Sequence, residues 1–160
     1  MPVKSEKQNV SLTGEFFVLA QLTIRNMVAT LTLGHTKGVD ILLSNPQTGK
    51  LFKVEVKTTT AGIVKSSLFG SNYEWFMNEK HEKIIDPSLY YCFVALEEVD
   101  LLPKFYIVAG KEVAEYVKEQ HQTWLKQPRK KIVQNTQMRM FRIDATKKSK
   151  YENAWHVFEN

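Results

Sequence analysis

Cysteine is almost missing from this sequence, which contains only Cys92. A single thiol excludes an internal disulfide framework and any CxxC zinc or redox motif, and its apolar neighbours predict a core residue. Long apolar runs are also missing, because the longest, residues 90–96, is too short to span a bilayer. Residues 1–7 are polar and lack the apolar centre of a signal peptide. We therefore expect a soluble, cytoplasmic protein.

Sequence patterns of several common enzyme and binding classes are missing as well. The chain has no GxSxG, Walker A, GxGxxG or EF-hand sequence, so none of the corresponding families is indicated. Its histidines lack the spacing of zinc ligands; they are His35, His81, His121 and His156. We expect His81 and its neighbour Glu82 to lie on the surface of a helix, with a supporting role near the phosphate as the alternative.

The 160 residues do contain enough apolar sequence for one core, together with an uneven distribution of charge. Hydrophobic residues make up 43% of the chain, which predicts a globular domain. The net charge is +5, and residues 126–150 carry nine Lys and Arg against one acid. Such a block favours contact with a polyanion, although a solvated surface segment explains it equally well. The residues that we expect to contact nucleic acid are Lys126, Arg129, Lys130, Lys131, Arg139, Arg142, Lys147 and Lys148.

The order of periodic segments predicts a mixed α/β domain built around one sheet. Alternating or continuous apolar runs predict strands at residues 30–33, 38–44, 51–59, 89–96, 104–109 and 139–143. Helical spacing predicts helices at residues 11–29, 74–85, 112–126 and 151–158. In the first helix the expected N-cap is Ser11, and the expected buried stripe is Phe16, Ala20, Ile24, Met27, Val28 and Leu31. We expect residues 1–10 to form a polar lead-in and residues 11–160 to form one domain.

Charged side chains on two neighbouring predicted strands form the most informative pattern. Along residues 51–59 the side chains alternate between faces, so Glu55 and Lys57 project from the same face. Asp40 lies in the preceding apolar run, where a carboxylate is costly to bury unless something neutralises it. The turn sequence at residues 45–50 predicts a hairpin that brings Asp40 beside Glu55.

Two converging carboxylates repel each other, and a divalent cation relieves that repulsion. Hard oxygen ligands select Mg²⁺, which keeps several waters and leaves room for a phosphate oxygen. The ion can polarise a phosphoryl group and lower the pKa of a bound water. Lys57, on the same face, would orient that water or stabilise negative charge on the phosphorus. The pattern is therefore suited to hydrolysis of a phosphodiester.

These residues resemble the PD-(D/E)XK nuclease superfamily, whose restriction-endonuclease-like fold is shared by Holliday-junction resolvases. The resemblance rests on Gly14-Glu15, Val39-Asp40 and Glu55-Val56-Lys57, with Val39 in place of the proline of the family's name. It covers about residues 11–97 and implies a helix, a meander of strands that carries the acids, a helix and another strand. Later stretches are similar to small bacterial proteins of the same fold.

The resemblance implies a Mg²⁺-dependent endonuclease that acts on DNA, with Mn²⁺ able to replace Mg²⁺. It implies that Asp40, Glu55 and the Val56 carbonyl bind the metal. Lys57 would assist the attacking water, and Glu15 would be a ligand of the metal or the water, or an orienting group. It also implies products with 3′-hydroxyl and 5′-phosphate ends and, because two strands need two sites, a homodimer.

A simpler explanation exists for each of these residues. Glu55 and Lys57 could form an exposed cross-strand ion pair, and Asp40 could be a strand-end aspartate bonded to backbone. Glu15 could be an acid that stabilises the N-terminus of its helix. The corresponding functions are a catalytically silent nucleic-acid- or partner-binding module on the same fold, or an unrelated α+β interaction protein.

Overall fold

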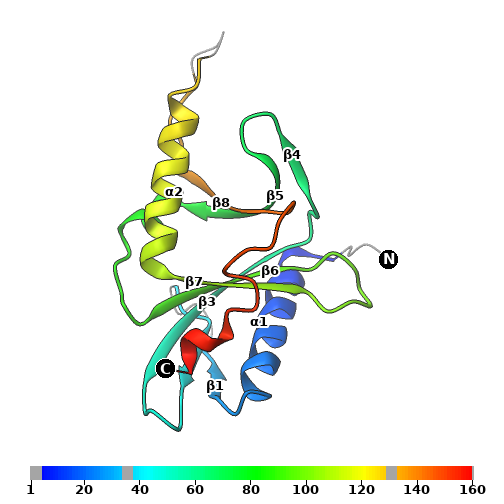
Figure 1. Ribbon diagram of the computed structural model, residues 1–160, viewed down its shortest axis with the longest axis vertical. Helices are drawn as coiled ribbons and strands as arrows, with labels where there is room; N and C mark the ends of the chain where they lie inside the picture. The colour runs from blue at the N-terminus through cyan, green and yellow to red at the C-terminus, as the bar shows by residue number, and fades with distance from the viewer. Residues whose placement is uncertain (1–4, 34–37, 129–132, 160) are drawn as a thin grey trace.

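Two β-sheets organise residues 5–33, 38–128 and 133–159, which are the residues described by this computed structural model (Figure 1). The central sheet has the order β1-β2-β3-β6-β7, formed by β1 (Val28–Leu31), β2 (Ile41–Ser44), β3 (Leu51–Thr59), β6 (Leu89–Ala95) and β7 (Lys104–Ala109). The second sheet has the order β4-β5-β8, formed by β4 (Val64–Ser66), β5 (Gly70–Asn78) and β8 (Met138–Asp144). The helices are α1 (Lys7–Thr23) and α2 (Gly110–Leu125), with 3-10 turns η1 (Glu79–Lys83) and η2 (Trp155–Phe158). The expected mixed α/β class, with helices flanking a central mixed sheet, is confirmed.

β3 and β6 form the middle of the central sheet. They pair in parallel, whereas the other neighbouring strands of this sheet are antiparallel. Every residue of β6 except Tyr90 is buried, which confirms the predicted strand with both faces covered. Its Cys92 is fully buried, as expected, and burial raises the pKa of the thiol.

Each face of the central sheet has its own hydrophobic core. On one face α1 and η2 pack against the sheet, and Val18 and Leu22 join Val54 in a single buried cluster. On the other face α2 and the second sheet cover β6 and β7, and Trp75 and Phe141 belong to that cluster. Figure 1 shows α1 and α2 on opposite sides of the central strands. Within the described residues, no helix combines the length and the apolar character needed to cross a membrane.

Several predicted boundaries move in the structure. α1 begins at Lys7, four residues before the expected start, and its N-cap is Glu6 instead of Ser11. β2 begins at Ile41 and not at residue 38, which leaves Asp40 just outside the ladder. Of the helix expected at residues 151–158, only the 3-10 turn η2 forms. The strands expected at residues 51–59 and 104–109 have the predicted bounds.

The buried face of α1 differs from the expected stripe. Its buried residues, spaced four apart, are Gly14, Val18 and Leu22. Phe16 and Ile24, which were expected inside, are 54% and 76% exposed. The reason lies at Gly14, because a Cβ there would overlap the Thr58 hydroxyl of β3. Glycine lets α1 approach β3 closely at this position, and that contact selects which face of the helix is buried.

The helix predicted at residues 74–85 is wrong, since these residues form most of β5 and then the turn η1. β5 buries Trp75 and leaves Phe76 71% exposed, an alternation of two residues that is typical of a strand. Antiparallel pairing with β8 places Trp75 opposite Phe141. The cross-strand partner, which is distant in sequence, therefore overrides the helix preference of this Lys- and Glu-rich segment.

Candidate metal and catalytic site

Asp40 directly precedes β2 and faces β3. The ladder between β2 and β3 reaches Ile41 opposite Val54. Beyond it, the Asp40 N–H donates to the Val54 carbonyl at 2.9 Å, and the Val56 N–H donates to Oδ2 of Asp40 at 2.7 Å. The Asp40 carboxylate thus takes the place on β3 that a backbone carbonyl of β2 would otherwise occupy. Because the N–H and C=O of a strand residue point to the same neighbour, the Val56 carbonyl also faces this end of β2.

Glu55, the residue before Val56, is only 3% exposed. Its Oε1 lies 2.5 Å from Lys57 Nζ and 3.4 Å from His81 Nε2. Its Oε2 is buried and has no hydrogen-bond partner among the described residues. Burial acts to raise the pKa of Glu55, but the hydrogen bond with His81 and the Lys57 charge outweigh it and lower the pKa to about 2. The carboxylate is therefore anionic at neutral pH, with one oxygen held and the other unsatisfied.

The pKa values of the other two acids, Asp40 and Glu15, are shifted in the opposite direction. Burial raises the pKa of Asp40, and the Glu55 charge adds to this rise, while the Val56 hydrogen bond and Lys57 oppose it. Burial also raises the pKa of Glu15, and the charge of Asp40 adds to it, while Ser11 and Lys57 oppose it. The pKa of each of these acids is thus shifted by the charge of another of the predicted site residues.

Direct contacts join Lys57 to Glu55 and Asp40 to the Val56 N–H, and the charge of Asp40 acts on Glu15 of α1. Glu15 is the ninth residue of α1 and does not lie in its first turn. The explanation of Glu15 as an acid that stabilises the start of a helix therefore does not apply. Lys57 retains 28% exposure of its side chain, so its ammonium can meet both Glu55 and solvent.

The donor set suits a hard cation. Two carboxylates and a backbone carbonyl supply oxygen atoms only, and the unsatisfied Oε2 of Glu55 is an acceptor in need of a partner. Across residues 5–33, 38–128 and 133–159, no group of three or more His, Cys, Asp or Glu side chains is close enough to form a ligand cluster. A metal here would accordingly rely on few protein ligands and keep several waters, as Mg²⁺ commonly does.

His81 lies beside Glu55, a placement that the sequence interpretation did not favour. It was expected on the surface of a helix, but it lies in η1 and is only 4% exposed. Its neighbour Glu82 is half-buried and pairs with Arg139 of β8. The sequence carried no signal for this placement, because it depends on η1 following a strand whose partner, β8, lies about 60 residues away in the chain.

The basic segment is only partly exposed. Arg139 and Arg142 are largely buried and pair with Glu82 and Glu74 respectively, the second pair at 2.7 Å. These two guanidinium groups are therefore neutralised inside the fold. Lys126, Lys147 and Lys148 are exposed, whereas Arg129, Lys130 and Lys131 lie outside the described residues.

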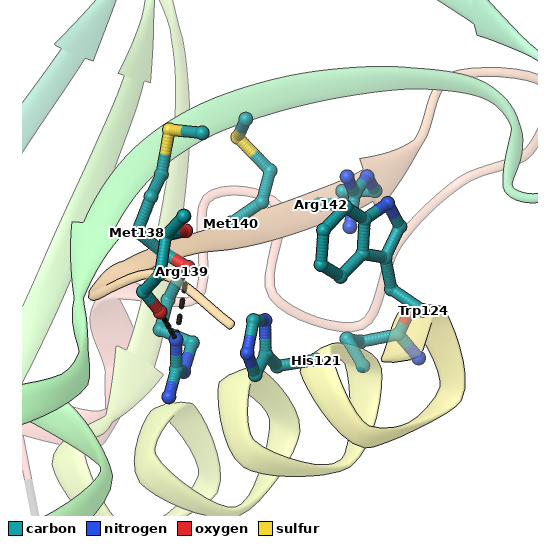
Figure 2. Close-up of a pocket in the computed structure, with 8 residues that line it drawn as sticks. His121, Trp124, Met138, Arg139, Met140 and Arg142 are labelled. Carbon is teal, nitrogen blue, oxygen red and sulfur yellow. Dashed lines mark hydrogen bonds between the residues drawn. The ribbon is translucent and has the colours of Figure 1, made fainter. Parts of the chain in front are cut away.

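A cavity of about 140 Å³ lies between the C-terminal half of α2 and β8 (Figure 2). His121 and Trp124 line it from α2, where their rings stack with centroids 5.6 Å apart. Met138 and Met140 line it from β8. Arg139 forms part of its wall and donates to the Thr136 and Met138 carbonyls, as the dashed lines in Figure 2 show. None of the four predicted residues of the candidate site lines this cavity.

Comparison with known proteins identifies the fold. No model of a known protein family matches the sequence, and no curated protein matches it. Among solved structures, the chain is similar to that of the bacterial homing endonuclease I-Ssp6803I, with a TM-score of 0.56 and 15% sequence identity. The match covers 98% of this chain and 94% of that chain. At this identity the likeness concerns the fold alone.

Proposed function

We propose that this protein is a metal-dependent phosphodiesterase that cleaves DNA as an endonuclease. The observation that supports the proposal is the arrangement on neighbouring strands of Glu55, paired with Lys57, and Asp40, bonded to the Val56 N–H, with a buried oxygen on Glu55 that has no hydrogen-bond partner among the described residues. The fold, shared with a homing endonuclease, supports the same reading. Carboxylates that can hold a metal and a lysine that can stabilise negative charge are groups suited to hydrolysis of a phosphodiester.

Asp40, Glu55 and the Val56 carbonyl would hold Mg²⁺, and Mn²⁺ could replace it. When bound, the metal supplies charge that polarises the phosphoryl group and lowers the pKa of a coordinated water. Glu55 supports this role because its carboxylate stays ionised, with a pKa of about 2. Asp40 supports it because burial and the Glu55 charge disfavour its anion, so a nearby cation would relieve a real electrostatic cost.

Lys57 and Glu15 would act on the reacting groups. The Lys57 ammonium lies beside Glu55 yet reaches solvent, so it could orient the attacking water and stabilise negative charge on the phosphorus. Glu15 has a raised pKa, which makes it a better proton acceptor than an ordinary glutamate. It would bind or orient the same water from α1. The expected products carry 3′-hydroxyl and 5′-phosphate ends.

The exposed lysines of the basic segment would contact the DNA backbone. Lys126, Lys147 and Lys148 are available for this, and Arg129, Lys130 and Lys131 remain part of the proposal from their sequence positions. Lysines recognise phosphate charge more than base identity, so binding should weaken steeply with salt and show little sequence preference. A homodimer would provide the two sites that cutting both strands requires.

The direct test is incubation with supercoiled, linear, single-stranded and branched DNA in Mg²⁺, Mn²⁺ or EDTA. We expect metal-dependent cutting that Lys57→Ala abolishes. Lys53→Ala is the matched control, because Lys53 lies on the same strand and face but pairs with Asp86 at 2.8 Å. Loss of cutting in both variants, or in neither, would contradict the assigned role of Lys57.

A catalytically silent binding module on the same fold is the second candidate. The observation that favours it is that Lys57 and Asp40 already have partners within the protein, at Glu55 and at the Val56 N–H. In that case the same assay would show salt-sensitive DNA binding without cutting in any metal. Neither binding nor cutting would leave an unrelated interaction protein as the explanation.

A further inference from the structure

His81 meets the candidate site through a single, well-defined contact. Its Nε2 lies 3.4 Å from Oε1 of Glu55, and both side chains are 4% exposed. The edge of its ring packs against the Tyr91 ring, with centroids 6.0 Å apart. A buried imidazole that reaches a buried carboxylate in this way can only donate to it, because an ionised carboxylate only accepts.

The other ring nitrogen, Nδ1, lies against the backbone of Asn78. The Asn78 N–H donates to Nδ1 of His81 at 3.0 Å, in the capping arrangement that begins η1. The same Nδ1 also lies 2.9 Å from the Asn78 carbonyl, so the contacts at Nδ1 fit either tautomer. Glu55 is the partner that favours a hydrogen on Nε2, because an ionised carboxylate only accepts.

This contact gives the two oxygens of Glu55 different environments. His81 and Lys57 both approach Oε1, while the Tyr91 hydroxyl, on the residue opposite Glu55 in β6, is a further group that interacts with this carboxylate. Beside Oε2 lies Gly38, where a Cβ would come within 3.5 Å of that oxygen. Gly38 has a φ of +73°, a conformation that favours glycine, so position 38 itself places no side chain beside Oε2.

A buried ion pair fixes the turn that carries His81. Glu82 follows His81 in η1 and pairs with Arg139 of β8, whose side chain is 6% exposed. Arg139 also donates to the Thr136 carbonyl at 2.7 Å, which ties it to the backbone ahead of β8. The imidazole is thus held from β8 through Glu82 and from β5 through Asn78.

We propose that His81 is a positioning residue of the metal site: its Nε2–H holds Oε1 of Glu55 and thereby presents Oε2 to the metal. The proposal rests on the proposed function, because it assigns a support to the same carboxylate. Partners that orient a metal ligand through its outer atoms commonly contribute about 10- to 100-fold to metal affinity. Arg139 becomes part of the framework of the site and is not a contact to DNA phosphate.

The test measures Mn²⁺ binding by isothermal titration calorimetry, with no substrate present. His81→Phe keeps a ring of similar size but removes the donor, and should weaken Mn²⁺ about 10- to 100-fold. His81→Gln keeps an N–H at a similar reach and should retain most of the affinity. His121→Phe is the matched control, because His121 is also a buried histidine but bonds Asn135. It should leave Mn²⁺ binding unchanged.

Nitrogen-15 NMR of the wild-type protein provides a second measurement that does not depend on any variant folding. We expect neutral His81 to carry its hydrogen on Nε2. The opposite tautomer, or unchanged Mn²⁺ affinity in folded His81→Phe, overturns the role of His81 while leaving the metal site in place. If Glu55→Gln binds Mn²⁺ as well as the wild type, the metal site itself is wrong, and the role of His81 fails with it.

Discussion

Replacing Glu55 by glutamine removes a carboxylate whose ionised form the folded protein stabilises. The change should therefore appear in the pH dependence of the unfolding free energy. The folded-state pKa of Glu55 is about 2, against an ordinary value of 4.5. At about 1.4 kcal/mol per pKa unit, this difference corresponds to about 3 kcal/mol of stabilisation. The side chain is 4% exposed, so solvent screening has little effect on that figure.

The sign follows from proton binding. Between pH 4.5 and about 2 the unfolded chain binds more protons at this residue than the folded protein does. Glu55 therefore contributes its full stabilisation above pH 4.5 and loses it as the pH falls towards 2. Over this interval the wild type should lose about 3 kcal/mol more unfolding free energy than Glu55→Gln, which keeps the shape of the side chain.

Urea denaturation at a series of pH values measures both proteins on the same scale. Lys53→Ala provides a reference for an exposed ion pair, in which Lys53 lowers the pKa of Asp86 but solvent screens the interaction. Equal pH slopes in the wild type and Glu55→Gln would refute the view that Lys57 and His81 hold this carboxylate in its ionised form.

Three other changes test separate parts of the structure. Asp40→Asn removes an acid whose pKa is raised by burial and by Glu55, so the Tm of the metal-free protein should rise. The increase in Tm that Mn²⁺ causes in the wild type should vanish in this variant. An unchanged increase in scanning calorimetry contradicts a shared metal site. Gly14→Ala should cost about 1–3 kcal/mol in urea titration, because its Cβ meets the Thr58 hydroxyl, and adding Thr58→Ala should restore most of the loss. Arg139→Met leaves the Glu82 charge without its partner and should lower the unfolding free energy by about 3–5 kcal/mol. The double variant Arg139→Met with Glu82→Leu should recover that stability. A small loss in the single variant would show that the ion pair is unimportant for stability.

The strands with local signals were the most predictable part of the fold. β3 alternates apolar and charged residues, β6 is nearly all apolar, and both were expected where they occur. β5 was not predictable in the same way. Its segment around Trp75 combines a strand-like alternation with residues that favour a helix, and pairing with β8 decides between them.

In the candidate site, too, only the residues with local sequence signals were predictable. The residue types and their spacing led to Asp40, Glu55 and Lys57, since alternation along β3 and a short hairpin act over few residues. Their influence on one another's pKa agrees with that grouping, while their catalytic roles remain predictions. His81 could not be found in this way, because it reaches Glu55 only after β5 pairs with β8.

The amino-acid sequence by itself determined the mixed α/β class and the central strands, and it predicted the residues of the candidate site, because periodicity and hairpin geometry are local properties of the chain. Only the tertiary structure decided which face of α1 is buried, which cations are neutralised inside the fold and which oxygen of Glu55 is left unsatisfied. These features depend on contacts between segments far apart in sequence, such as Gly14 with Thr58 and Arg139 with Glu82. Such contacts form only when the sheets and helices pack, so no local pattern in the sequence predicts them.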